Sequence, residues 1–238
     1  MVMIRTYGAS QRGPQHIRSL SPNQDAWIKA EGRFGSLIAV CDGVGSRELS
    51  HLGAKAACLA VKEAIARWSR QERSPASLII RLIELYWRLR IAPHAPEEVA
   101  TTCLFALHRP DGSWIVGGLG DGLLGISSAS SWTWPIGGRE ASAYANETEA
   151  LGARLFSKKW FLQELHPSQQ PRSIILATDG ISDDLKANSL DLFGDWFLNH
   201  FGPMEPAERW RGITKMLRDW PTPKHLDDKT IAVIEFLP

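Results

Sequence analysis

Cysteine is scarce in this chain. Cys41, Cys58 and Cys103 are the only three in 238 residues, and no two of them have the C-x-x-C spacing. An odd set of thiols in apolar surroundings argues against a disulfide framework and predicts reduced cysteines, as in a cytoplasm. The polar N-terminus lacks the apolar core of a signal peptide, and no apolar run approaches the length of a membrane span. We therefore expect a cytoplasmic protein without a membrane partner.

The sequence also lacks an excess of charge of either sign. Its 27 basic and 26 acidic residues give a net charge of +1, so nucleic acid is not expected as a partner. The motifs of several enzyme classes are missing as well: there is no H-E-x-x-H, no G-x-x-x-x-G-K-[ST] and no G-x-S-x-G. Zinc-hydrolase, nucleotide-loop and serine-hydrolase interpretations therefore lack their motifs.

Two apolar runs stand out among the residues that are present. Residues 36–41 lead into Asp42-Gly43, and residues 173–178 lead into Asp179-Gly180. An uninterrupted apolar run of this length is typical of a buried strand. A strand that ends in Asp followed by Gly presents a carboxylate at the edge of a sheet, because glycine lets the backbone turn there.

The remaining patterns predict an α+β fold. We expect strands at 3–7, 24–30, 36–41, 101–107, 113–118, 123–127, 132–136, 173–178 and 230–236, and helices at 50–69, 74–89, 189–201 and 207–220. Segregated helices and largely antiparallel strands predict a four-layer α-β-β-α sandwich, two mainly antiparallel sheets flanked by antiparallel helix pairs. Residues 1–238 form a single domain in this interpretation. Residues 137–171 are expected to be a mobile excursion with a helix in it, and only 159–165 carries a regular pattern.

Acidic residues occur at the ends of five predicted strands. They are Asp25, Asp42, Asp121, Asp179 and the pair Asp227-Asp228. A single Asp-Gly is most simply a turn, since that dipeptide is favoured in turns. Several carboxylates at one sheet edge would repel one another, however, and divalent cations such as Mg²⁺ and Mn²⁺ relieve that repulsion with oxygen ligands. The pattern therefore predicts a metal centre.

Six motifs in this order resemble those of the metal-dependent protein phosphatases, the type 2C (PPM) family, and are most similar to its compact bacterial branch. They span nearly the whole chain: Asn23-Gln24-Asp25-Ala26, Val40-Cys41-Asp42-Gly43-Val44-Gly45, Ala100-Thr101-Thr102, Gly120-Asp121-Gly122, Ala177-Thr178-Asp179-Gly180-Ile181-Ser182-Asp183 and Asp227-Asp228-Lys229-Thr230-Ile231. The fold that this resemblance implies is a β-sandwich between helix pairs. Residues 137–171 match the place of the family's variable flap, where substrate choice is expected.

The resemblance also implies the cofactors and their ligands. Asp42 would bridge two Mn²⁺ or Mg²⁺ ions, and the Gly43 carbonyl would complete one shell. Asp179 and Asp227 would bind the first ion, and Asp25 would hold the other through water.

A third, weaker ion would lie at Asp121 together with Asp179. The catalytic residues would be Asp42, Asp179 and Asp227, because a hydroxide that bridges two cations attacks phosphorus directly and needs no phosphoenzyme.

Two positions depart from the family pattern. The family usually has an arginine phosphate clamp three residues before the asparagine of the first motif, and this chain has Leu20 there. Arg18, with His16 beside it, is the candidate phosphate-binding group; a solvated loop charge for Arg18 and a loop role for His16 are the alternatives. Some family members have a histidine after the first Asp-Gly, where this chain has Val44.

The resemblance implies a Mg²⁺/Mn²⁺-dependent serine/threonine protein phosphatase, expected to be a monomer whose partners are phosphoproteins made by a bacterial Ser/Thr kinase. Two alternatives stay open. The first is a catalytically weak homologue that binds phosphoproteins as a regulatory module, which the missing arginine favours. The second is a phosphatase of small phosphate esters.

Overall fold

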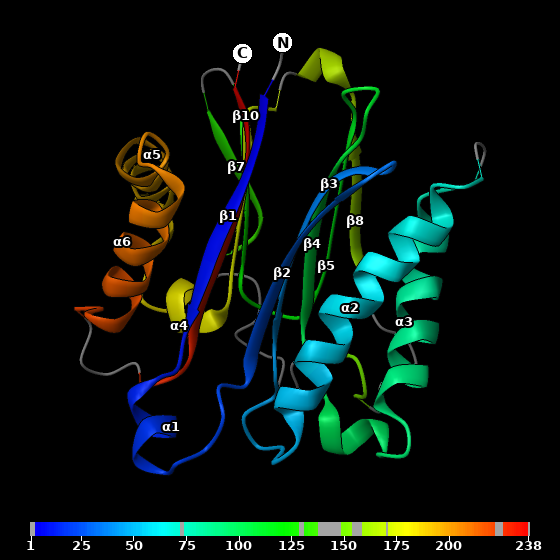
Figure 1. The fold of residues 1–238 in the computed structure, drawn as a ribbon, viewed down its shortest axis with the longest axis vertical. Helices are drawn as coiled ribbons and strands as arrows, with labels where there is room; N and C mark the ends of the chain where they lie inside the picture. Colours follow the sequence, from blue (N-terminus) through cyan, green and yellow to red (C-terminus); the bar gives the residue numbers. More distant parts are fainter. Residues whose placement is uncertain are drawn as a thin grey trace.

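The computed structural model describes residues 3–71, 74–128, 131–137, 149–153, 159–169, 171–221 and 226–237. Within these residues the chain forms two five-stranded sheets that pack face to face, with helices on both outer sides (Figure 1). The predicted α+β fold, a four-layer α-β-β-α sandwich, is confirmed. In the described part of the chain, no helix is long and apolar enough to cross a membrane.

Each sheet contains antiparallel neighbours. The first has the order β1-β10-β9-β6-β7, formed by Met3–Gln11, Lys229–Leu237, Ser173–Ala177, Leu123–Ser127 and Trp132–Ile136. The second has the order β2-β3-β4-β5-β8, formed by Asp25–Gly32, Gly35–Asp42, Cys103–His108, Trp114–Leu119 and Phe161–Leu165.

The long helices pair on opposite faces of the sandwich. In Figure 1, α2 (Ser50–Trp68) and α3 (Ser77–Ile91) lie beside the second sheet, and α5 (Leu190–Phe201) and α6 (Pro206–Arg218) lie beside the first. Two short helices, α1 (Pro14–Arg18) and α4 (Asp179–Ser182), lie toward the lower end of that view. Single 3₁₀ turns occur at Pro96–Val99, Pro167–Gln169 and Ala187–Ser189.

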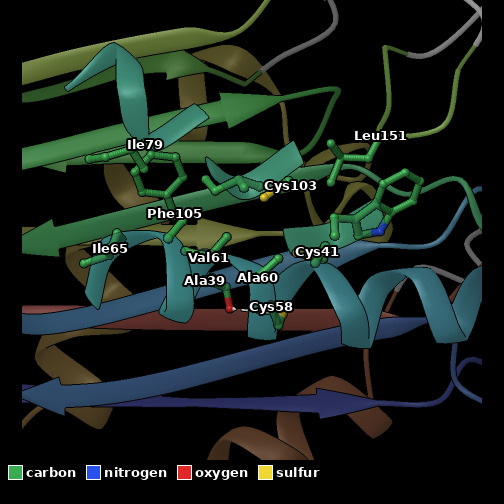
Figure 2. Close-up of a cluster of buried hydrophobic side chains, with 14 of the residues drawn as sticks. Ala39, Cys41, Cys58, Ala60, Val61, Ile65, Ile79, Cys103, Phe105 and Leu151 are labelled. Carbon is green, nitrogen blue, oxygen red and sulfur yellow. Dashed lines mark hydrogen bonds between the residues drawn. The ribbon is translucent and has the colours of Figure 1, made fainter. Parts of the chain in front are cut away.

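The position of β3, covered on both faces, explains why its sequence is an almost uninterrupted apolar run. Leu37, Ala39 and Cys41 belong to the core under α2 and α3, which Figure 2 shows in part. Ile38 and Val40 belong to the core between the two sheets. Successive side chains of a strand point to opposite faces, so a strand covered on both faces has no polar positions between its ends. After Ser36 near its start, the next charged or hydroxyl side chain of β3 is Asp42, its last residue.

The one segment with a regular pattern inside the predicted excursion, residues 159–165, is largely a strand. Residues 159–165 lie largely in β8, which pairs antiparallel with β5 and places Leu165 opposite Trp114. The edge of β5 offers an unpaired row of backbone donors and acceptors, and pairing with it outweighs a weak local pattern. The rest of the predicted excursion falls mostly at 138–148, 154–158 and 170, outside the described residues.

Two boundaries also differ from the prediction. The helix expected from position 74 begins at Ser77, because Ser74 and Pro75 form a turn whose carbonyls accept hydrogen bonds from Trp68 Nε1 at 3.1 Å each. The segment after β1, predicted as a loop, contains the helix α1.

Candidate metal centre

The structure brings the predicted acidic residues to one place. Asp25 begins β2, Asp42 ends β3, and the two are directly opposite each other in the strand pair. Asp179 follows β9 and Asp227 precedes β10, which is the neighbour of β9. Electrostatic interactions connect Asp42 with Asp25 and Asp179, and connect Asp179 with Asp121 and Asp227.

The exposure of these carboxylates increases from Asp25 in the interior to Asp121 and Asp227 at the surface. Asp25 is only 5% exposed, Asp42 and Asp179 are half-buried, and Asp121 and Asp227 are exposed. The cluster is therefore open to solvent on one side.

Burial and mutual repulsion raise the pKa values of the inner acids. Burial and the charges of Asp25 and Asp179 raise the pKa of Asp42 well above its ordinary value. Burial, aided by the charge of Asp228, raises the pKa of Asp25 to about 7, although hydrogen bonds from neighbouring side chains oppose this increase. The pKa of Asp179 rises to about 6, chiefly through burial and then through neighbouring carboxylates.

Hydrogen bonds fix the backbone at Asp42. The amide N–H of Asp42 donates to Thr102 Oγ1 at 3.0 Å, and its carbonyl accepts from Thr101 Oγ1 and from the Thr102 amide, both at 2.8 Å. The next residue must be glycine, because a Cβ at Gly43 would lie 2.7–2.8 Å from atoms of Ser50 at the start of α2. The end of β3 is thus held on both sides, which orients the Asp42 carboxylate.

The side chain of Asp25 is held across the two sheets. Thr178 Oγ1 donates to Asp25 Oδ2 at 2.9 Å and accepts from the Thr230 amide at 3.0 Å. The amide of Asp25 donates to Asn23 Oδ1 at 2.9 Å. Threonine at 178 therefore ties β2 of one sheet to β9 and β10 of the other.

A buried lysine lies behind the acids. Lys229, the first residue of β10, is 3% exposed, and its Nζ donates to the Asp227 carbonyl at 3.0 Å. Burial lowers its pKa, and the nearby charges of Asp184, Asp227 and Asp228 partly restore it. A single lysine does not balance the surrounding carboxylates, so the site keeps an excess of negative charge.

The two predicted phosphate contacts lie on α1. Arg18 is exposed and, among the described residues, makes no hydrogen bond or ion pair. His16 is 8% exposed, and its Nδ1 lies 2.8 Å from Asp228 Oδ2. Because a carboxylate only accepts, Nδ1 carries the proton and donates it to this bond.

The donor set fits hard divalent cations. It consists of carboxylate and carbonyl oxygens, which are the ligands that Mg²⁺ and Mn²⁺ prefer. Burial first, and neighbouring carboxylates second, raise the pKa values of Asp25, Asp42 and Asp179, so ionisation of the whole cluster is costly without a cation. Cations placed among Asp25, Asp42, Asp121, Asp179 and Asp227 would offset that cost.

Sequence reasoning missed the residues that hold the acids in place. Asp228 appeared only as the second half of an Asp-Asp pair, although it is 2% exposed, whereas Asp227 is exposed. The alternation of β10 carries a signal for this difference, since neighbouring residues at a strand end face opposite ways. No sequence signal was available for the roles of Thr178 and Lys229.

The family model of protein phosphatase 2C matches residues 12–220. The chain belongs to the protein phosphatase 2C family. No curated protein sequence matches the chain.

Several solved structures of similar fold are bacterial phosphatases. The serine/threonine phosphatase Stp1 from Staphylococcus aureus is 17% identical with a TM-score of 0.68, and the alignment covers 99% of this chain and 96% of that one. The PPM Ser-Thr phosphatase MsPP from Mycobacterium smegmatis, in complex with cacodylate, is 17% identical with a TM-score of 0.64, and 97% of each chain is covered. The catalytic domain of PstP, solved with two manganese ions, is 16% identical with a TM-score of 0.62 and full coverage of both chains.

Proposed function

We propose that this protein is a Mg²⁺/Mn²⁺-dependent phosphatase that hydrolyses phosphoserine and phosphothreonine in proteins. The observation that carries the proposal is the position of Asp42, half-buried between Asp25 and Asp179 with a strongly raised pKa. A buried cluster of like charges is costly, so a chain without a use for cations has little reason to build one. Membership of the protein phosphatase 2C family supports the reaction class.

The proposed metal ligands would hold two cations. Asp42 would hold two Mn²⁺ or Mg²⁺ ions, and the Gly43 carbonyl would be a ligand of one of them. Asp179 and Asp227 would hold the first ion, and Asp25 would hold the other through water. Two such cations, when bound, supply charge that activates water for direct attack on phosphorus and that neutralises the phosphoryl oxygens.

The outer part of the site would serve the substrate. Asp121 is exposed beside Asp179 and is the proposed place of a third, weaker ion. Arg18 is proposed to contact the phosphate as a charged clamp. His16 has Nδ1 occupied by Asp228, which leaves Nε2 for a second phosphate contact.

At the level of the whole chain, we propose that residues 1–238 act as one phosphatase domain and that 137–171 select the substrate. The proposed partners are phosphoproteins made by a bacterial Ser/Thr kinase, and the protein would act as a cytoplasmic monomer. The exposed position of Arg18, together with Leu20 at the usual clamp position, favours a second candidate, a weak homologue that binds phosphoproteins as a regulatory module.

Hydrolysis of a phosphothreonine peptide and of p-nitrophenyl phosphate in Mn²⁺ separates these functions. We expect turnover of both substrates, with the larger kcat/KM for the peptide. A larger kcat/KM for the small ester would support a small-molecule phosphatase. Peptide binding in Mn²⁺ without turnover of either substrate would support the regulatory module and contradict the proposed enzyme.

Replacement of Arg18 by alanine should raise KM for the phosphopeptide several-fold and leave Mn²⁺ affinity unchanged. The reason is that an exposed guanidinium contacts the phosphate and not the cations. Steady-state kinetics and calorimetry measure the two quantities. Arg12 offers a matched control, because its guanidinium donates to the Ser21 carbonyl on the same loop at 3.1 Å. An unchanged KM for Arg18→Ala would remove Arg18 from the site.

A further inference from the structure

Asp228 is a buried carboxylate to which the metal ligands named above give no role. It is 2% exposed and accepts three hydrogen bonds: from the Gly13 amide at 2.6 Å, from the Gln24 amide at 2.6 Å and from His16 Nδ1 at 2.8 Å. Bonds to a charged acceptor are stronger than neutral ones, and a buried carboxylate depends on them. Both oxygens are therefore occupied by N–H donors from the chain.

These three bonds join segments that carry proposed metal ligands. Asp228 directly follows Asp227 and directly precedes β10, and Gln24 directly precedes Asp25 at the start of β2. β10 belongs to one sheet and β2 to the other. Sheets that pack face to face share no ladder of hydrogen bonds, so side-chain bonds of this kind set the distance between their ends.

His16 supplies the donor from α1. Its imidazole is 8% exposed, and a second bond, from the Gln15 amide to the Leu226 carbonyl at 3.0 Å, holds the same helix against the segment before β10. One nitrogen of His16 and one oxygen each of Asp227 and Asp228 lie within 4.8 Å of one another. Since the oxygens of Asp228 already accept three N–H groups, this trio is better explained as a support for Asp227 than as a separate metal site.

We propose that Asp228 and His16 form a positioning pair that holds Asp25 and Asp227 at the spacing needed to bind divalent cations. The inference rests on the proposed function, because it assigns the pair to the same metal centre. Hydrogen-bond partners behind metal ligands typically change metal affinity 10- to 100-fold when they are replaced. The pair affects the metal centre through Asp25 and Asp227. Asp228 itself contacts neither the cation nor the substrate.

The test measures Mn²⁺ affinity by calorimetry, apart from any activity, in four variants of the full chain. Asp228→Asn replaces one of the two acceptor oxygens by an amide NH₂ group, which donates and does not accept, and His16→Ala removes the imidazole donor. Both should bind Mn²⁺ at least about tenfold more weakly. His16→Asn places an amide nitrogen where Nδ1 lies and should restore most of the affinity. Glu235→Gln changes another buried carboxylate of the same strand, far from the site, and should leave Mn²⁺ affinity unchanged.

The outcomes separate this inference from the proposed function. Wild-type affinity in both Asp228→Asn and His16→Ala would overturn the positioning pair while the phosphatase stands. Equal losses in His16→Ala and His16→Asn would overturn it as well, since the imidazole itself would then matter. Failure of the wild-type protein to bind Mn²⁺ would overturn the proposed function along with the pair. If Asp228→Asn does not fold, the two His16 variants decide, because α1 is a short surface helix.

Discussion

Replacement of Asp42 by asparagine is expected to abolish divalent-cation binding and to reduce hydrolysis to background. Asp42 is the member of the cluster that interacts with both Asp25 and Asp179. A neutral amide of the same shape removes the central charge and leaves the hydrogen bonds of the Asp42 backbone intact. Calorimetry with Mn²⁺ and turnover of a phosphopeptide measure the two losses.

Asp111 provides the matched control for this variant. It is an exposed aspartate in the turn between β4 and β5, at the opposite end of the strands from the acidic cluster. Asp111→Asn should retain Mn²⁺ binding and turnover, so a loss in both variants would point to general damage. Full activity of Asp42→Asn would remove Asp42 from the reaction and the metal centre with it.

The stabilisation that Mn²⁺ gives to the folded protein should grow steeply between about pH 4 and pH 7. In the folded state the pKa of Asp25 is about 7 and that of Asp179 about 6, both above their ordinary value. In EDTA the folded state therefore holds more protons than the unfolded state in this window, and these groups lower the free energy of unfolding as pH rises. Each contributes at most about 1.4 kcal/mol per pH unit.

Bound Mn²⁺ reverses this trend, because metal ions bind deprotonated carboxylates and displace their protons. The measurement is the thermal midpoint with Mn²⁺ minus that in EDTA, taken across the window. His51 and His108, whose pKa values burial lowers, change stability in the opposite direction, but they do so in both buffers and cancel in the difference.

The same pH series on Asp42→Asn tests whether Asp42 contributes to this pH dependence. Burial and the charges of Asp25 and Asp179 raise the pKa of Asp42, so Asp42 lowers the stability of the wild-type protein in EDTA as pH rises. The amide does not titrate, so in EDTA above pH 6 this variant should melt higher than the wild-type protein. In Mn²⁺ the order should reverse. A Mn²⁺ effect that is independent of pH, or a variant that melts lower in EDTA, would contradict the raised pKa values as a consequence of like charges.

The fold was predictable where tertiary burial agrees with local pattern. The run 36–41 predicts β3 because both faces of that strand are covered, and its end at Asp42 follows from the same sequence. The strand at residues 159–165 was not predicted, because β8 depends on the edge of β5, which no local pattern reports. The start of α3 shifted for a similar reason, since Trp68 bonds the carbonyls of Ser74 and Pro75 from a distance.

The acidic residues of the candidate site were predictable from sequence, but the hydrogen bonds that hold them in place were not. Strand-end aspartates can be recognised from sequence, and the structure brings Asp25, Asp42 and Asp179 together. Some of the bonds that hold the site join residues more than 150 positions apart, such as Thr178 to Asp25 and His16 to Asp228. Nothing in a single sequence indicates such pairs before the sheets are packed.

Removal and return of Mn²⁺ tests the central claim most directly. The protein is treated with EDTA, desalted and titrated with Mn²⁺, while bound metal and phosphopeptide turnover are followed in the same sample. The metal centre proposed here predicts no turnover without metal and a return of turnover in step with occupancy by two ions. Turnover that survives complete removal of divalent cations would contradict it.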